Sequence, residues 1–471
     1  MLFYSLEFAL FFLAVFLAYH ALPMAAKKPF LLIASLWFYA AWDWRFLGLI
    51  LLSSGTDFLC GRLISAEARP KRRNAWLLLS LAVNLGILGF FKYFHFFISS
   101  FHEVFPLIPM PGLKIILPVG ISFFTFQSLS YTIDIYRGQA RPAPALDFFL
   151  FVAFFPQLLS GPIVRASEFL PQLRALPPLA WDDVWEGLLL FARGFAKKVF
   201  LAGLLSRFAD PVFAHPQAHG AWECLLAAYA FAFQIYWDFS GYTDMARGCA
   251  LALGFRFPEN FRLPYLSASP REFWRRWHMT LSAWLRDYLY KSLGGDRHGR
   301  LATLRNLFVT MALGGLWHGA QWTFVIWGCY HGVLLMLQRL ISPPDGLGNI
   351  ADTLPVLKAS AWKPLRIFLT FHLICLGWIF FRSESLSMAM RFLGRLFSGP
   401  WDWTPALTLA GIGLSACAAG QITAAFLHGR RASGRGFGPI WDVAGLAAMA
   451  IGMVFAFIYS TESAPFLYFQ F

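Results

Sequence analysis

The stretch Gly314-Gly315-Leu316-Trp317-His318-Gly319-Ala320 places a histidine among glycine and tryptophan inside a strongly apolar region. The surrounding run from Leu307 to Leu337 contains no Asp, Glu, Lys or Arg. An ionisable imidazole in such a setting costs several kcal/mol unless it is solvated, paired or used. The flanking glycines let the backbone bend or approach a neighbour closely. The stretch therefore predicts a membrane-embedded segment and makes His318 a candidate site residue.

The composition indicates a membrane environment for most of the 471-residue chain. It is 58% hydrophobic and only 14% charged, whereas soluble domains carry about 25% charged residues. We predict an all-α polytopic membrane protein with about 11 transmembrane helices, each of about 20 residues, plus re-entrant or half-helices. The half-helices are expected at 147–163 and 306–317. The apolar segments are 2–24, 29–42, 45–66, 75–98, 115–136, 147–163, 184–206, 221–253, 306–317, 320–338, 364–381, 404–427 and 440–460.

The formal net charge of +14 follows a membrane pattern and does not indicate a nucleic-acid surface. Basic residues gather in the short loops at 25–28, 68–73 and 137–141, which the positive-inside rule assigns to the cytoplasm. The segment 42–45 is then an outer turn, and the N-terminus is periplasmic. The apolar start of the chain lacks a basic leader region, so we expect a retained first helix. The six cysteines form no C-x-x-C pair and are expected to be buried packing residues, with no metal site.

The stretch from 256 to 305 is different because arginines alternate with aromatic residues. Its pattern from Pro270 to Leu289 predicts one amphipathic helix, capped by Ser269 and begun by proline. Composition favours an interfacial helix whose Lys and Arg reach lipid headgroups. The alternative is a basic funnel that attracts a polyanionic substrate.

Several polar residues in apolar segments remain as candidates. His278 and His318 could perform general acid and base chemistry if they converge on one pocket. His331 would lie off the face of His318 on an unbroken helix, and His372 is expected to be a packing histidine bonded to a backbone carbonyl. Earlier in the chain, Asp244 and Arg247 have the spacing of a structural ion pair. Asp238 and Tyr242 are pocket-lining candidates in the same cluster.

Taken together, several motifs resemble the membrane-bound O-acyltransferase family, and within it the branch that acetylates bacterial polysaccharides such as alginate. The resemblance covers nearly the whole chain, and the order and spacing of its motifs make it specific. The matching blocks are Pro118-Val119-Gly120-Ile121-Ser122-Phe123-Phe124, Phe155-Pro156-Gln157-Leu158-Leu159-Ser160-Gly161-Pro162, Asp238-Phe239-Ser240-Gly241-Tyr242-Thr243-Asp244, Phe273 to Gly295, Gly314 to Ala320, and Trp327-Gly328-Cys329-Tyr330-His331-Gly332.

The resemblance implies a single membrane-embedded domain over 1–471 around a central tunnel. In it, 256–305 forms cytoplasmic-side amphipathic helices and 307–340 forms the catalytic histidine region. The family's catalytic histidine corresponds to His318 and its second position to His278. We expect His318 to be the base that activates an acceptor hydroxyl, and His278 to orient the acyl donor or stabilise the oxyanion. The expected substrate-binding residues are Arg275, Arg276, Trp277, Arg286, Trp317, Asp238 and Tyr242.

The resemblance further implies acetyl-CoA as a cytoplasmic donor, with no permanently bound cofactor. The protein would lie in a bacterial inner membrane, surrounded by lipid. It would pass acetyl groups toward an exported polysaccharide, through a periplasmic SGNH-type acetyltransferase or a similar acceptor protein. One alternative is D-alanyl transfer to teichoic acid from a carrier-protein thioester. A remote alternative is a proton-coupled transporter, although the inverted repeats common in transporters are not evident.

Overall fold

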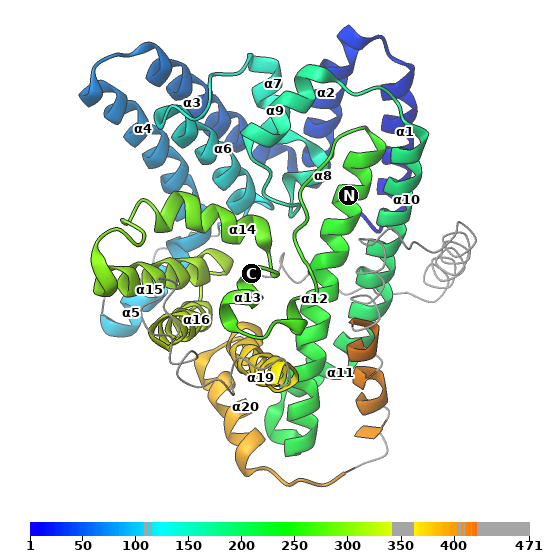
Figure 1. Cartoon of the computed structure of the whole chain (residues 1–471), viewed down its shortest axis with the longest axis vertical. Coiled ribbons are helices and arrows are strands. Elements are labelled where there is room, and N and C mark those ends of the chain that lie inside the picture. Colours follow the sequence, from blue (N-terminus) through cyan, green and yellow to red (C-terminus); the bar gives the residue numbers. More distant parts are fainter. Residues whose placement is uncertain are drawn as a thin grey trace. The chain divides into compact units, whose positions relative to one another are not determined.

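The computed structural model describes residues 1–107, 112–113, 115–341, 362–403 and most of 407–421. All regular elements in these ranges are helices, which confirms the all-α prediction for the described part (Figure 1). The predicted apolar segment 404–427 is described only in part, and 440–460 lies outside the described residues. Contacts within the chain divide it into two units, Met1–Phe195 with Tyr242–Pro258, and Ala196–Gly241 with Glu259–Phe471.

The first unit contains the N-terminal helices and the C-terminal part of α12. Exposed large apolar side chains, such as Leu10 and Trp37, cover its outer helices, as expected for surfaces that meet lipid. Its helices are α1 (Leu6–Ala21), α2 (Met24–Asp43), α3 (Leu47–Ala66), α4 (Pro70–Leu88), α5 (Phe94–Val104), α6 (Ile121–Tyr136), α7 (Ala145–Ala153), α8 (Phe155–Leu158), α9 (Ala166–Ala175) and α10 (Trp181–Phe195), with Tyr242–Ala252 of α12 (Ala221–Ala252).

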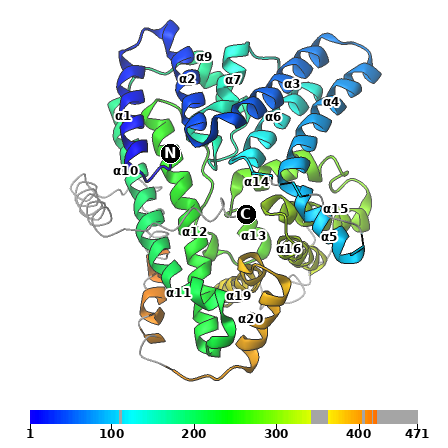
Figure 2. The same ribbon diagram turned by 180° about the vertical axis from the view of Figure 1, so that it is seen from behind.

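Two local features shape this unit. The predicted turn at 42–45 is confirmed, because Asp43 accepts hydrogen bonds from the backbone and guanidinium of Arg45 between α2 and α3. The fully buried Asp57 on α3 accepts hydrogen bonds from Ser80 and Asn84 on α4 and from Ser128 on α6. A buried carboxylate is tolerated only with such partners. Asp57 thereby connects α3, α4 and α6, which lie side by side in Figure 2.

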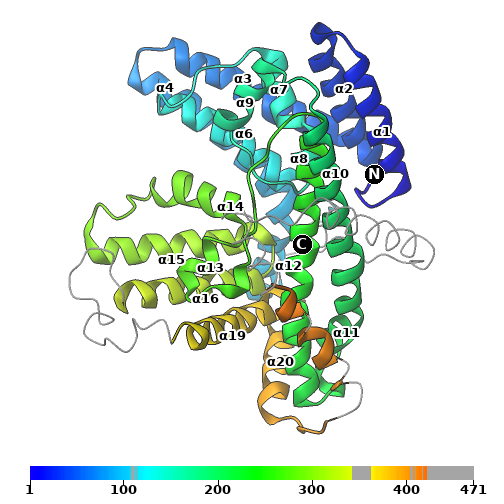
Figure 3. The ribbon, with the colours of Figure 1, turned by 45° about the vertical axis from the view of Figure 1, so that its right-hand side comes forward.

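The second unit contains the remaining helices, among which α15 and α16 form an extensively packed pair. Figure 3 shows α14, α15 and α16 stacked, with α19 following α16. The helices are α11 (Gly203–Ala214), the first part of α12, α13 (Pro270–Trp274), α14 (Met279–Trp284), α15 (Gly299–His318), α16 (Trp322–Ile341), α19 (Lys363–Arg382) and α20 (Leu386–Ser398), and π-helical turns cover Ala196–Ala202 and Leu285–Tyr290.

Two predicted elements differ from the structure. The single helix predicted from Pro270 to Leu289 is broken after Trp274, because the backbone near its middle bonds elsewhere. The amide of Arg262 donates to the carbonyl of Arg276, and the amide of Met279 donates to that of Asn260. The predicted half-helix 306–317 is the end of the 20-residue α15, which begins within a basic stretch.

The number of membrane spans remains a prediction. Within the described residues, four helical stretches are long and apolar enough to cross a membrane. The helix Leu6–Ala21 is apolar but shorter. The four stretches are Met24–Ala66, Pro70–Val104, Trp322–Ile341 and Lys363–Arg382.

Candidate functional site

A cavity of about 570 Å³ runs along the α15–α16 pair of the second unit, and His318 lines it. One face of α15 contributes Leu307, Met311, Gly314 and His318, a spacing of three and four residues that keeps them in line. Helix α16 contributes Trp327 beside His318, at 5.0 Å between ring centroids, and Arg339 toward its C-terminal end. The cavity therefore extends from an imidazole to a basic region.

Close contact between two glycines positions His318. A Cβ on Gly315 would lie 2.8 Å from the Cα of Gly328 and would also collide with the carbonyl of Phe324. The two backbones can approach this closely only because both positions lack side chains. His318 is the last residue of α15, and Gly319 continues in extended conformation. The glycines that flank the histidine in the sequence thus place its ring against α16.

His278 occupies the turn between α13 and α14, with a left-handed backbone of φ 41°. Its Nδ1 lies 3.1 Å from Oδ1 of Asn260, which also accepts from the backbone amide and the hydroxyl of Thr280. Because the amide of Thr280 can only donate, this atom of Asn260 is the oxygen, and His278 Nδ1 must carry the hydrogen. Nε2 is then the accepting nitrogen of the neutral ring.

Burial keeps His278 neutral, because it lowers the pKa of the imidazole from 6.5 to about 3. A neutral ring with hydrogen on Nδ1 cannot donate from Nε2 to an oxyanion. This tautomer argues against the oxyanion role. His278, Trp277 and Trp317 do not line the cavity, so the orienting role of His278 stays a prediction. Trp317 contacts the rings of both histidines, with centroid distances of 6.1 Å to His278 and 5.0 Å to His318. Trp277 is fully buried and stacks on Phe273.

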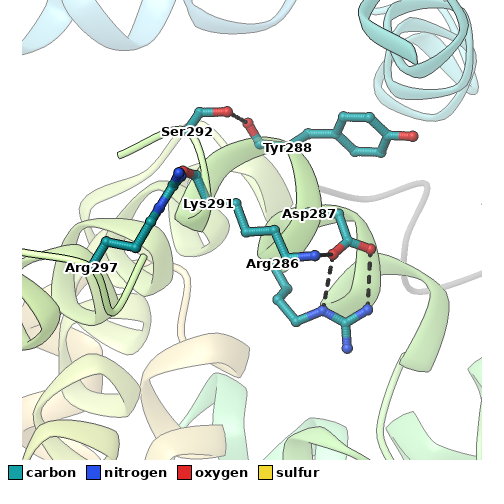
Figure 4. Close-up of polar contacts among 6 residues, drawn as sticks. All are labelled: Arg286, Asp287, Tyr288, Lys291, Ser292 and Arg297. Carbon is teal, nitrogen blue, oxygen red and sulfur yellow. Dashed lines mark hydrogen bonds and ion pairs between the residues drawn. The ribbon is translucent and has the colours of Figure 1, made fainter. Parts of the chain in front are cut away.

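The predicted arginines separate into different environments. Arg275 and Arg286 line the cavity, whereas Arg276 does not and pairs with Glu272 at 2.7 Å. Figure 4 shows the guanidinium of Arg286 beside the carboxylate of Asp287, to which Lys291 also bonds. Within the described residues, no carboxylate lies within ion-pair distance of Arg275.

Two arginines that the sequence did not single out complete the basic region. Arg271 and Arg339 line the cavity. Burial, and after it the charges of Arg275 and Arg339, lowers the pKa of Arg271. Arg339 bonds to Asp296 at 3.2 Å. Such a group of like charges favours an anionic ligand. Arg271 and Arg339 lie at opposite ends of a 68-residue interval, so only the fold brings them together.

The α12 candidates do not line this cavity. Asp238 forms a buried ion pair with Lys198, which lies 40 residues away and carries no motif in the sequence. Tyr242 belongs to the first unit, where its ring stacks on Phe3 at 4.7 Å. The predicted pair of Asp244 with Arg247 is confirmed at 3.5 Å. All six cysteines are free. Four are buried as expected, whereas Cys329 and Cys417 are partly exposed.

Two further histidines lie on α16 and α19. His331 would lie off the face of His318 only on an unbroken helix, but α15 ends at His318 and α16 begins at Trp322. Both rings consequently contact Trp327, at centroid distances of 5.0 Å for His318 and 4.9 Å for His331. His372 bonds to the carbonyl of Phe368 at 2.8 Å, as predicted.

Comparison with known proteins places these features in a family context. Residues 87–344 match the model of the membrane-bound O-acyltransferase family. A probable alginate O-acetylase, AlgI, of Pseudomonas putida is 44% identical over 85% of this chain and 81% of its own length. The peptidoglycan O-acetyltransferase of Helicobacter pylori is 37% identical over 80% of this chain and 76% of its own length. The teichoic acid D-alanyltransferase of Bacillus subtilis is 28% identical over 58% and 71%, respectively.

Proposed function

The chain belongs to the membrane-bound O-acyltransferase family, and we propose that it moves acetyl groups from cytoplasmic acetyl-CoA toward O-acetylation of an exported, alginate-like polysaccharide. One observation carries the proposal: His318 lines the same cavity as Arg271, Arg275, Arg286 and Arg339. A histidine is suited to activate a hydroxyl, and arginines are suited to bind phosphates. Acetyl-CoA presents a thioester and phosphates on one molecule.

The length of the cavity supports this donor. Trp327, next to His318, and Arg339 are separated by about 18 Å along α16, at 1.5 Å per residue. An extended pantetheine arm is a thin chain of comparable length. With the phosphates at Arg339, Arg271 and Arg275, the thioester would lie near His318. The mainly apolar wall between the two ends suits the arm.

The proposed reaction is direct transfer. The acceptor hydroxyl gives its proton to the unprotonated nitrogen of His318 while its oxygen attacks the thioester carbonyl carbon. The tetrahedral intermediate then collapses, the carbon–sulfur bond breaks, and the leaving thiolate takes the proton from His318. His278 does not line the cavity, and we propose that it acts through Trp317, whose ring contacts both histidines. The products are an O-acetyl ester and coenzyme A.

We further propose that the acceptor lies on the periplasmic side of an inner membrane. The acceptor is either the polysaccharide or a periplasmic SGNH-type acetyltransferase that acetylates it. The relatives named for alginate and peptidoglycan O-acetylation support a glycan as the final acceptor. The teichoic acid relative makes a carrier-protein D-alanyl thioester the rival donor.

The test is thiol release from acetyl-CoA by purified protein in nanodiscs, with and without a short alginate or peptidoglycan acceptor. We expect release by the wild type and its loss, by a factor on the order of 10³ or more, in His318→Ala. Turnover of a carrier-protein D-alanyl thioester in place of acetyl-CoA would overturn the proposed donor. Release that persists in His318→Ala would overturn the proposed base.

Neighbouring arginines provide a matched test of phosphate binding. Arg275→Gln should raise KM for acetyl-CoA about 10-fold, because a charged hydrogen bond to phosphate contributes about 1.5 kcal/mol. It should also weaken the salt dependence of KM. Arg276→Gln is the control, since Arg276 does not line the cavity and pairs with Glu272. Equal KM values in the two variants would exclude Arg275 from donor binding.

A further inference from the structure

His331 lies behind the cavity wall near His318. Its ring is fully buried on α16 and contacts Trp274 of α13 at 5.1 Å and Trp327 at 4.9 Å between centroids. Both tryptophans line the cavity, whereas His331 does not. On the side of α19, Gly377 packs directly against the ring, because a Cβ there would lie 2.9 Å from Nε2. Aromatic rings and a glycine backbone thus enclose the imidazole.

This enclosure offers neither ring nitrogen a conventional hydrogen bond. Within the described residues, neither Nδ1 nor Nε2 of His331 has a hydrogen-bond partner. A buried polar group without a partner costs about 1–3 kcal/mol. The ring is nearly perpendicular to Trp274, at 85°, and steeply inclined to Trp327, at 69°. These orientations suit an N–H directed at an indole face, which recovers only part of the cost.

An apolar ring would be less costly at this position, so packing alone does not account for a histidine. Trp327 links it to the candidate base, since the same indole contacts both His331 and His318. The contact with His318 is perpendicular, at 89°. Trp378 stacks on Trp327 at 5.7 Å and 19°, which restricts how that indole can move.

We propose that His331 is a positioning residue for acyl transfer. It fixes the orientation of the Trp327 indole, and through it the ring of His318, by directing an N–H at the indole face. It does not contact the substrate. The role rests on the proposed function, in which His318 is the base and acetyl-CoA is the donor.

The test replaces His331 by phenylalanine, which keeps the ring and removes the N–H. We expect an unchanged or higher melting temperature, because an unsatisfied polar group is lost. Donor KM should stay within about twofold, whereas kcat should fall on the order of 10- to 100-fold from misplacement of His318. His331→Gln, which keeps an N–H donor, should recover part of kcat. His372→Phe on α19 is the control and should retain wild-type kcat.

A double-mutant cycle with Trp327→Phe examines whether His331 acts through that indole. The double variant should be no slower than the slower single variant, since both changes remove the same alignment. A wild-type kcat in His331→Phe would overturn the proposal, as would additive losses in the cycle. If the wild type does not cleave acetyl-CoA, the proposed donor fails. The same variants are then assayed with the carrier-protein D-alanyl thioester as the donor. The same changes in kcat then support or overturn the positioning role of His331.

Discussion

At the scale of single residues, the environments of His278 and His318 separate their roles. Asn260 fixes the hydrogen of His278 on Nδ1, and the ring is fully buried. His318 instead reaches the cavity at the end of α15. Two histidines that look alike in the sequence therefore differ in the structure: His278 is a buried neutral ring that does not line the cavity, whereas His318 lines it and is the candidate base. The pH dependence of protein stability can test whether His278 is buried as a neutral ring.

We predict that His278 makes the protein less stable as the pH falls. Its pKa is about 3 in the folded protein and 6.5 ordinarily. Between these values the unfolded chain binds a proton that the folded protein does not, so the free energy of unfolding decreases as the pH falls from 6.5 toward 3. The contribution of the neutral His278 to the free energy of unfolding is fully present above pH 6.5. Between the two pKa values the free energy of unfolding falls by up to about 1.4 kcal/mol per pH unit.

Thermal unfolding of the purified protein between pH 4 and pH 8 measures this effect. His278→Gln should show a shallower fall of the melting temperature with decreasing pH than the wild type. His215→Gln is the control because His215 is exposed, and it should retain the wild-type slope. Identical slopes in the wild type and His278→Gln would contradict the burial of a neutral imidazole.

At the scale of elements, the Gly315–Gly328 contact sets the distance between α15 and α16. We predict that Gly315→Ala forces the two helices apart, because the added Cβ meets backbone atoms that cannot rotate away. The cost should be about 2–4 kcal/mol of stability, with a larger than 10-fold loss of kcat as His318 leaves Trp327. Melting temperature and thiol release measure the two effects.

A glycine without neighbours supplies the control. Gly86 lies in α4, and a Cβ there would meet nothing within 4 Å. Gly86→Ala should therefore leave kcat unchanged and stabilise its helix by about 1 kcal/mol. A Gly315→Ala variant that behaves like Gly86→Ala would mean that the helix contact does not position the site.

The same elements show how far the sequence predicts the structure. The apolar run and its glycines identified the region of His318, because membrane segments have a strong compositional pattern. The break after Trp274 was missed, because periodicity from Pro270 to Leu289 cannot reveal that Asn260 and Arg262 bond to the middle of that segment. Arg271 and Arg339 were missed for a related reason, since only tertiary packing brings residues from two distant helices to one cavity.

At the scale of the whole molecule, the charge distribution predicts which loops face the cytoplasm and which face the periplasm. The basic loops at 25–28, 68–73 and 137–141 predict cytoplasmic faces, and the turn at 42–45 then faces the periplasm. A donor from the cytoplasm requires the arginine-lined part of the cavity to open to the same side as the basic loops. Asp296 lines the cavity with a side chain that is 60% exposed, and Arg45 in the turn is equally exposed.

We therefore predict opposite labelling of cysteines placed at these two positions. In a background with Cys329 and Cys417 replaced by serine, Asp296→Cys should react with a membrane-impermeant maleimide in inverted vesicles and not in intact spheroplasts. Arg45→Cys should show the reverse. The four remaining cysteines are buried and should stay unlabelled. Labelling of both positions from one side would refute the topology, whereas labelling of Asp296→Cys from the periplasm alone would also exclude a cytoplasmic donor at this cavity, since acetyl-CoA could not reach the arginines.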